Sequence, residues 1–164
     1  MQHLKILNRK EKNQLIAILE EQYGFQGELD YTFLLSKKNK MYLVNNDFAR
    51  IDTSKLRIDS VGMYFGEIVG NQMRVSIEGS QLIGSQITKN IAIISKAVAK
   101  LWLHGHDLEF SAVEIKEGTE GFVIVKSINS INNSFSDDFL GCGKITTEKL
   151  ANYISKNRCL KTSD

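Results

Sequence analysis

The sequence has 164 residues, 42% of them hydrophobic and 24% charged, which suits one ordinary domain or two small ones. Its formal net charge of +2 allows a nucleic-acid partner but does not require one, because binding to a polyanion depends on a local basic patch. The polar start MQHLKILNRKEK and the lack of a run of roughly 20 apolar residues predict a soluble, intracellular protein without a membrane partner. The two cysteines, Cys142 and Cys159, are expected to be reduced thiols.

The chain opens with a helix and a hairpin. Asn8 and Glu11 have the spacing of a capping box, which predicts a helix over about residues 9–23, and Gly24 suits its left-handed end. YTFLLS and MYLVN predict a hairpin from Tyr31 to Asn45. Its tip would be solvated or would contact phosphate through three basic residues, namely Lys37, Lys38 and Lys40.

Further strands and a short helix complete the first half of the chain. A helical turn capped by Asn46 and an exposed basic segment over 53–58 precede VGMYFGEIVG, a buried strand in which Gly62 and Gly66 permit a bulge or close packing. The next strand would point Met73, Val75 and Ile77 inward, and a short helix would span Ser80–Lys89.

The second half begins with the strand NIAII and a short helix capped by Ser95, which exposes Lys96 and Lys100 together. We expect LEFSAVEI and GFVIVKS as strands, SINSINNSFSDD as a polar loop, and FLGCGKI as a strand. Gly141 and Gly143 would leave one face of that last strand bare for another backbone or a ligand. TTEKLANYISK has helical spacing, and NRCLKTSD would be a short strand or a tail.

Positive charge is concentrated at the end of the chain. From Gly141 to Asp164 the acidic residues are Glu148 and Asp164, so five bases minus two acids give about +3. The five bases are Lys144, Lys149, Lys156, Arg158 and Lys161. This asymmetry indicates a polyanionic partner.

Enzyme and metal motifs are weak. GCGKIT is not a phosphate loop, because Asp138 and Ile145 stand where Gly and Ser or Thr are needed. His104 and His106 lack further ligands at a recognisable spacing, which disfavours a metal site. Tyr42, Tyr64, Phe65 and Trp102 lie in apolar patterns and are expected in the core, which leaves no platform for base stacking. We therefore predict no enzymatic activity, no metal and no cofactor.

The order of several motifs resembles the Nip-seven family of large-ribosomal-subunit biogenesis and pre-rRNA processing proteins of archaea and eukaryotes. The amino-terminal part is similar through FLLSKKNKMYLVNNDFARID, SVGMYFG and the following G-x-x-R-V-S-I strand. HG-x-D-L-x-x-S-A-V and the later GFVIVKS and LGCGKIT resemble that family's carboxy-terminal PUA domain, an RNA-binding pseudo-barrel. In that family the chain continues into a closing strand, whereas NRCLKTSD ends at Asp164, so either the barrel closes with a shortened strand or the last residues are lacking.

The resemblance implies an α+β fold with an amino-terminal α/β domain over residues 1–89, which contains an antiparallel sheet and helices. A PUA-type β pseudo-barrel would follow over residues 90–164, packed rigidly because no linker rich in Gly or Ser separates the two. The implied function is non-catalytic RNA binding in ribosome biogenesis.

The expected partners are pre-rRNA, including U-rich single strands, and ribosome-assembly or exosome-associated proteins. The protein would be a monomer, cytoplasmic in an archaeal-like cell and nuclear or nucleolar in a eukaryote. The expected RNA contacts are Lys96, Lys100, His104, Lys144, Lys149, Lys156, Arg158 and Lys161. The alternatives are a protein-interaction adaptor with weak or no RNA binding and an RNA-modifying enzyme or its detached RNA-binding domain.

Overall fold

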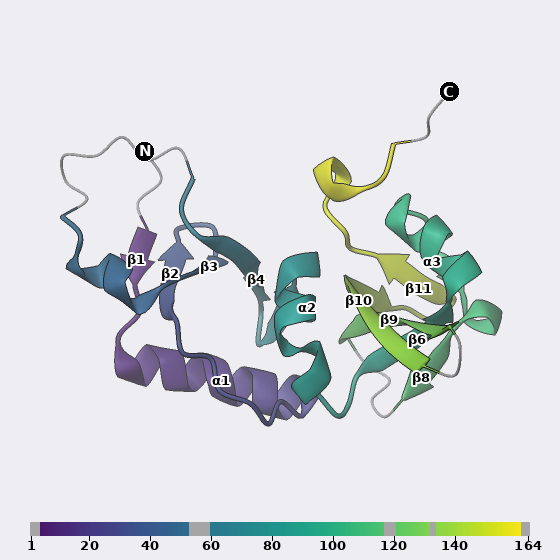
Figure 1. Cartoon of the computed structure of the whole chain (residues 1–164), viewed down its shortest axis with the longest axis horizontal. Coiled ribbons are helices and arrows are strands. Elements are labelled where there is room, and N and C mark those ends of the chain that lie inside the picture. Colours follow the sequence, from purple (N-terminus) through teal and green to yellow (C-terminus); the bar gives the residue numbers. More distant parts are fainter. Residues whose placement is uncertain (1–3, 53–59, 117–120, 132–133, 162–164) are drawn as a thin grey trace.

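The protein has a mixed α+β fold built on two sheets (Figure 1). The computed structural model describes residues 4–52, 60–116, 121–131 and 134–161. The basic segment expected at 53–58 and the end of the chain at Asp164 therefore lie outside the described residues. In the described part of the chain, no helix is long and apolar enough to cross a membrane.

Helix α1 (Arg9–Tyr23) confirms the predicted capping box. The Asn8 side chain accepts a hydrogen bond from the Glu11 N–H, and the Glu11 carboxylate accepts one from the Asn8 N–H, each at 3.0 Å. Gly24 ends the helix at φ +61°, a conformation that favours glycine. The buried stripe of the helix, which includes Leu19 and Tyr23, packs under the first sheet.

The first sheet is antiparallel, with strand order β1-β2-β3-β4-β5. The predicted hairpin is confirmed as β2 and β3, whereas β1 has no counterpart among the predicted elements. Met41 and Tyr42 of β3 pair with Gly66 and Tyr64 of β4, which leaves a bulge in β4 at Phe65, beside Gly66 as the glycine suggested. The strands are β1 (Leu4–Ile6), β2 (Thr32–Ser36), β3 (Lys40–Val44), β4 (Met63–Val69) and β5 (Gln72–Val75).

Two helical elements of the first half begin earlier than predicted. The 3-10 turn η1 (Asn46–Arg50) is capped by Asn45 rather than Asn46, because the Asn45 side chain accepts from the Asp47 N–H. Helix α2 (Ile77–Ile83) replaces the end of the predicted strand at Ile77, because the Ser76 side chain caps it by accepting from the Gly79 N–H at 2.9 Å. A 3-10 turn, η3 (Gly84–Gln86), follows in place of the predicted helix end.

The second sheet has strand order β7-β11-β10-β9-β6-β8 and curls into a half-barrel (Figure 1). Strand β6 runs parallel to β9 and is followed by α3 (Lys96–Leu103), where Ser95 is the predicted cap and accepts from the Val98 N–H. The strands are β6 (Ile91–Ser95), β7 (Leu108–Glu109), β8 (Glu114–Lys116), β9 (Gly121–Ile131), β10 (Ser134–Ile145) and β11 (Lys149–Asn152).

Two predicted elements between Leu108 and Asp138 are wrong. LEFSAVEI is broken by the 3-10 turn η4 (Phe110–Ala112), which sends β7 and β8 to opposite edges of the sheet. The described residues of SINSINNSFSDD form strands rather than a loop, because β9 and β10 pair along them. Asp137 and Asp138 lie on β10, where Asp137 pairs with Lys126 at 2.8 Å.

The predicted helix over TTEKLANYISK is wrong, because Lys149–Asn152 within it forms strand β11. The Thr146 hydroxyl accepts from the Lys149 N–H at 3.1 Å, which closes a tight turn and returns the chain alongside β10. Ile145 and Leu150 therefore face each other across the β10–β11 pair, and Leu150 is fully buried. Over so few residues, helical spacing and a short buried strand cannot be distinguished by periodicity alone.

The two sheets share one hydrophobic core. Tyr23 and Phe65 of the first half belong to the same buried cluster as Ile124, Phe139 and Cys142 of the second half. A second cluster fills the half-barrel around Trp102, whose indole N–H donates to the Leu140 carbonyl at 2.9 Å. The division into domains at residues 89–90 stays a prediction.

Polar contacts also cross between the halves. The Val75 N–H donates to the Cys142 sulfur at 3.2 Å, and the Gly141 N–H donates to the Ser80 hydroxyl at 2.9 Å. The Tyr23 hydroxyl lies 3.4 Å from the same sulfur and bonds the Met73 carbonyl at 2.6 Å. Burial raises the pKa of Cys142 to about 11, so the thiol stays neutral and structural.

Candidate nucleic-acid interface

Three of the predicted RNA-binding residues follow one side of α3. Lys96, Lys100 and His104 are spaced four residues apart, which aligns them along the helix. The first two are exposed and His104 is partly buried. Ala99 and Trp102, on another side of the helix, are buried in the half-barrel, so packing fixes which side faces outward.

The chain after β11 returns to the end of the same helix. We call residues 155–161 the tail; it contains the 3-10 turn η5 (Lys156–Arg158). The Leu160 N–H donates to the Leu103 carbonyl at 2.8 Å, and His104 Nδ1 lies 2.9 Å from the Leu160 carbonyl oxygen. These contacts hold the tail against the helix, so the exposed Lys161 lies next to the segment that touches His104.

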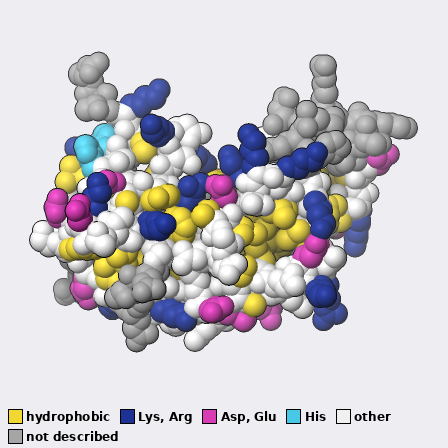
Figure 2. Space-filling view, turned by 180° about the vertical axis from the view of Figure 1, so that it is seen from behind, with side chains coloured by type: hydrophobic (Ala, Val, Ile, Leu, Met, Phe, Trp, Pro, Cys, Tyr) yellow, Lys and Arg dark blue, Asp and Glu magenta, His cyan; other side chains and the backbone are white. Residues whose placement is uncertain are grey.

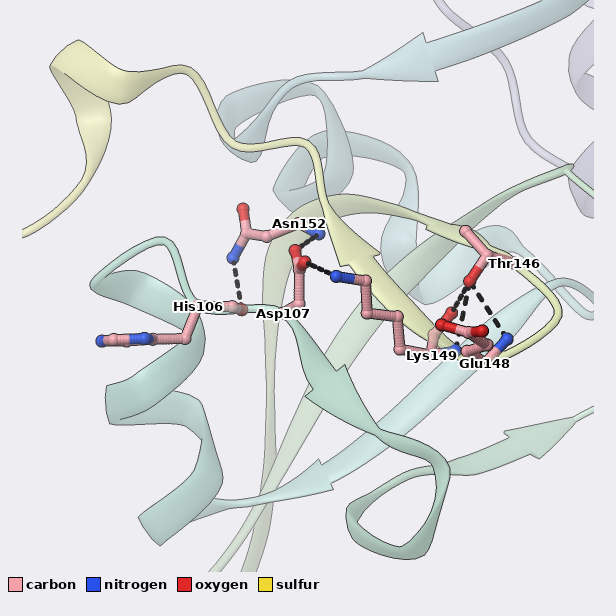
Figure 3. Close-up of polar contacts among 6 residues, drawn as sticks. All are labelled: His106, Asp107, Thr146, Glu148, Lys149 and Asn152. Atoms are coloured by element: carbon pink, nitrogen blue, oxygen red, sulfur yellow. Dashed lines mark hydrogen bonds and ion pairs between the residues drawn. The ribbon is translucent and has the colours of Figure 1, made fainter.

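Lys149 lies apart from the tail, at the start of β11. Its Nζ is 2.6 Å from the Asp107 carboxylate, which also accepts the Asn152 N–H at 2.8 Å (Figure 3). The hydrogen bond from Asn152, followed by Lys149, lowers the pKa of Asp107, and Asp107 raises the pKa of Lys149. The charge of Lys149 is therefore compensated within the fold.

Two other predicted contacts have defined partners. Arg158 forms an ion pair with Glu78 of α2, which ties the tail to the first half of the chain. The Nζ of Lys144 lies 5.6 Å from the ring centroid of Phe122 and remains exposed. The structure therefore separates the predicted cations into a group on α3 and the tail, and individual residues with partners elsewhere.

The strand face that Gly141 and Gly143 were expected to leave bare is covered at Gly143 by the protein itself. A Cβ on Gly143 would lie 2.8 Å from both Leu150 and Trp102, and one on Gly141 would lie 3.2 Å from Ile77. Both glycines are buried. The missing side chain of Gly143 thus makes room for close internal packing, whereas Gly141 also borders a cavity between the two halves of the protein.

A line of aromatic and cationic side chains was missed by the sequence analysis. Phe65 and Trp102 are fully buried as predicted, but Tyr42 and Tyr64 are only partly buried, and their ring centroids lie 5.6 Å apart. The alternation of side chains along a strand could have indicated this position. Successive residues point to opposite faces of the sheet, so Tyr42, next to the buried Met41, lies on the other, more exposed face.

The line continues across the boundary between the halves. The Arg74 guanidinium lies 5.8 Å from the ring centroid of Tyr153, and that ring meets Phe122 edge to face at 5.2 Å. Arg74 also pairs with Glu67. We call the cavity at this boundary the junction pocket; its lining includes Tyr64, Arg74, Glu78, Tyr153, Ser155 and Arg158.

The surface around the boundary is hollowed. Figure 2 shows a hollow at the upper edge of the molecule between its two halves, with Lys and Arg side chains on its walls. Tyr64 is half-buried, and burial raises the pKa of its hydroxyl despite the opposing interaction with Arg74. The pocket therefore combines the neutral phenol of Tyr64 and the ring of Tyr153 with paired guanidinium groups.

Comparisons with solved structures show the fold to which these surfaces belong. No protein-family model matches the sequence, and a search of curated proteins finds no match. The structure is similar to a conserved PUA domain protein from Thermoplasma acidophilum, with a TM-score of 0.56 and 10% identity over 95% of this chain and 97% of that one.

Two further archaeal structures agree. A PUA domain from Aeropyrum pernix K1 in complex with tartrate has a TM-score of 0.53 and 12% identity over 95% of this chain and 87% of that one. A hypothetical protein from Pyrococcus horikoshii OT3 has a TM-score of 0.54 and 13% identity over 99% of this chain and 89% of that one. The similarity supports a PUA-domain fold across nearly the whole chain.

Proposed function

We propose that this protein binds RNA through its carboxy-terminal half and catalyses no reaction. The PUA-domain fold of its structural neighbours supports a capacity for RNA binding. The observation that carries the proposal is a set of exposed lysines that form no ion pair within the described residues. They are Lys96, Lys100, Lys144, Lys156 and Lys161.

Such lysines contact phosphates, which position an RNA without reading its sequence. Lys149 and Arg158 contribute less in this proposal, because Asp107 and Glu78 already compensate their charges. His104 supports the tail through its contact with Leu160 and would reach RNA only at its exposed edge. The RNA-binding surface is thus the outward side of α3 together with the tail and Lys144 of β10.

The biological setting follows from the sequence resemblance to the Nip-seven family. In this proposal the protein acts in large-subunit assembly and pre-rRNA processing as a monomer without a cofactor. Residues 1–89 dock ribosome-assembly or exosome-associated proteins, and residues 90–164 hold pre-rRNA. The protein works in the cytoplasm of an archaeal-like cell, or in the nucleus or nucleolus of a eukaryote.

Direct titration tests the proposal. A labelled U-rich single strand is titrated with the protein at about 50 mM and about 200 mM salt, where phosphate contacts differ strongly in strength. We expect binding that weakens steeply with salt. The second candidate is a protein-interaction adaptor, favoured by the pairing of Arg158 with Glu78 and by the small net charge. An adaptor would show no binding even at the lower salt concentration.

A further inference from the structure

We propose that an unstacked base of single-stranded RNA binds at the mouth of the junction pocket, stacked on the exposed ring of Tyr153. This inference rests on the proposed RNA-binding function and assigns it a second, chemically different contact. Base recognition in single strands depends on aromatic faces and on guanidinium planes, which stack with any base. The pocket brings both kinds of group to one place.

The aromatic surface is available to a ligand. Tyr153 is 37% exposed although its ring makes a T-shaped contact with the buried Phe122. Tyr64 faces the same pocket from β4 and is half-buried. Tyrosine suits this role because it supplies a large, rigid face with only two side-chain torsions to fix.

The charges of the pocket favour a base over a phosphate. Arg74 is paired with Glu67, and Arg158 is paired with Glu78, so each guanidinium on the lining has a carboxylate partner. A phosphate placed here would meet the Glu78 carboxylate on the lining, whereas a neutral base would meet flat guanidinium groups that Glu67 and Glu78 hold in place. Arginine stacks on planar groups in this way, as it already does beside Tyr153.

Unpaired cations stand at both ends of the aromatic line. Lys40 Nζ lies 6.0 Å from the ring centroid of Tyr64 on the first half, and Lys144 Nζ lies 5.6 Å from that of Phe122 on the second. Within the described residues neither lysine forms an ion pair. Single-strand binding sites combine such a charged track for the backbone with aromatic rings for the bases.

This arrangement gives the two halves a common ligand. Tyr64 and Arg74 come from the first sheet, whereas Tyr153 and Arg158 follow the second. A single-stranded RNA that extends from the tail to the pocket would contact both halves of the protein at once. The first half would then contribute to RNA binding in addition to any role in docking proteins.

The test separates stacking from phosphate contact by salt dependence. A labelled U-rich single strand is titrated with the wild-type protein and with Tyr153→Ala, Tyr153→Phe and Phe110→Ala. Phe110 is the matched control, because it is also 37% exposed but lies on η4, outside the pocket. Fluorescence of the buried Trp102 verifies that each variant is folded.

We expect Tyr153→Ala to weaken binding by about 5- to 150-fold, the range for loss of one stacked base, with an unchanged slope of log affinity against log salt. Tyr153→Phe and Phe110→Ala should bind as the wild type does. If Tyr153→Ala binds RNA as tightly as the wild type, no base stacks at the pocket. The same conclusion holds if the substitution changes the slope of log affinity against log salt and leaves its intercept unchanged, and RNA binding would then depend on the lysines alone. If the wild-type protein itself fails to bind at low salt, the proposed function is refuted together with this inference.

Discussion

The tail lysines allow a quantitative prediction of salt dependence. Five exposed lysines among the predicted RNA contacts form no ion pair within the described residues, namely Lys96, Lys100, Lys144, Lys156 and Lys161. If each neutralises one phosphate of a single strand, log affinity should fall against log salt with a slope of about −3.5, at roughly 0.7 per contact. Replacing Lys156 and Lys161 by Ala should reduce this slope to about −2.1.

The loss of affinity of the double variant relative to the wild type should therefore be largest at low salt. Over a fourfold rise in salt, the ratio of wild-type to variant affinity should shrink by about sevenfold, because two fewer counterion contacts respond to the change. Fluorescence anisotropy with a labelled U-rich strand at several salt concentrations measures both slopes. Arg9→Ala with Lys10→Ala is the charge-matched control, because both residues are exposed at the start of α1 in the other half. Equal slopes for wild type and the tail variant, or an equal loss in the control, would refute the assignment of the tail.

The remaining predictions concern stability. Gly143→Ala should lower the free energy of unfolding by about 1–3 kcal/mol in urea, because its Cβ would clash with the buried Trp102; a change within experimental error would contradict this packing. Asn8→Ala should cost about 1 kcal/mol by removing the helix cap, and thermal unfolding would reveal it. The folded pKa of Cys142, about 11, lies above the unfolded value of 9.0, so the unfolded chain loses this proton first as pH rises. The ionisation of Cys142 alone should therefore lower the free energy of unfolding by up to about 3 kcal/mol as the pH rises between these two values. Cys142→Ala should abolish this contribution to the pH dependence. In the native state a thiol reagent should modify Cys159, which is partly exposed, well before Cys142.

Signals that act over a few residues predicted the structure well. The Asn8 capping box and the Ser95 cap each depend on a side chain and a backbone N–H three residues later, and the Gly24 helix end depends on the left-handed conformation of one glycine. The β2–β3 hairpin follows from two apolar runs separated by a short polar turn. In these cases the sequence contains both partners of the interaction, so the pattern is sufficient.

Elements stabilised by distant partners were predicted poorly. Leu150 and Ile154 have helical spacing, yet β11 forms because β10 lies beside it and buries Leu150. The polar stretch of the β9–β10 hairpin becomes strand because Lys126 and Asp137 pair across it. Neither partner strand can be identified from the periodicity of the segment itself.

The candidate site shows the same limit. Composition located the basic end of the chain, but it could not show that Asp107 compensates Lys149 or that Glu78 compensates Arg158. The glycines of β10 indicated close approach, although only the structure shows that Trp102 occupies the space beside Gly143. The junction pocket was missed because its walls come from distant parts of the chain.

RNA crosslinking in cell extract tests the central claim most directly. The protein is irradiated in extract, purified under denaturing conditions, and the attached RNA is sequenced. We expect pre-rRNA fragments crosslinked to the wild-type protein, and a smaller amount of them crosslinked to the Lys156→Ala, Lys161→Ala variant. Recovery of no more RNA than from a sample that was not irradiated would contradict RNA binding and favour the adaptor.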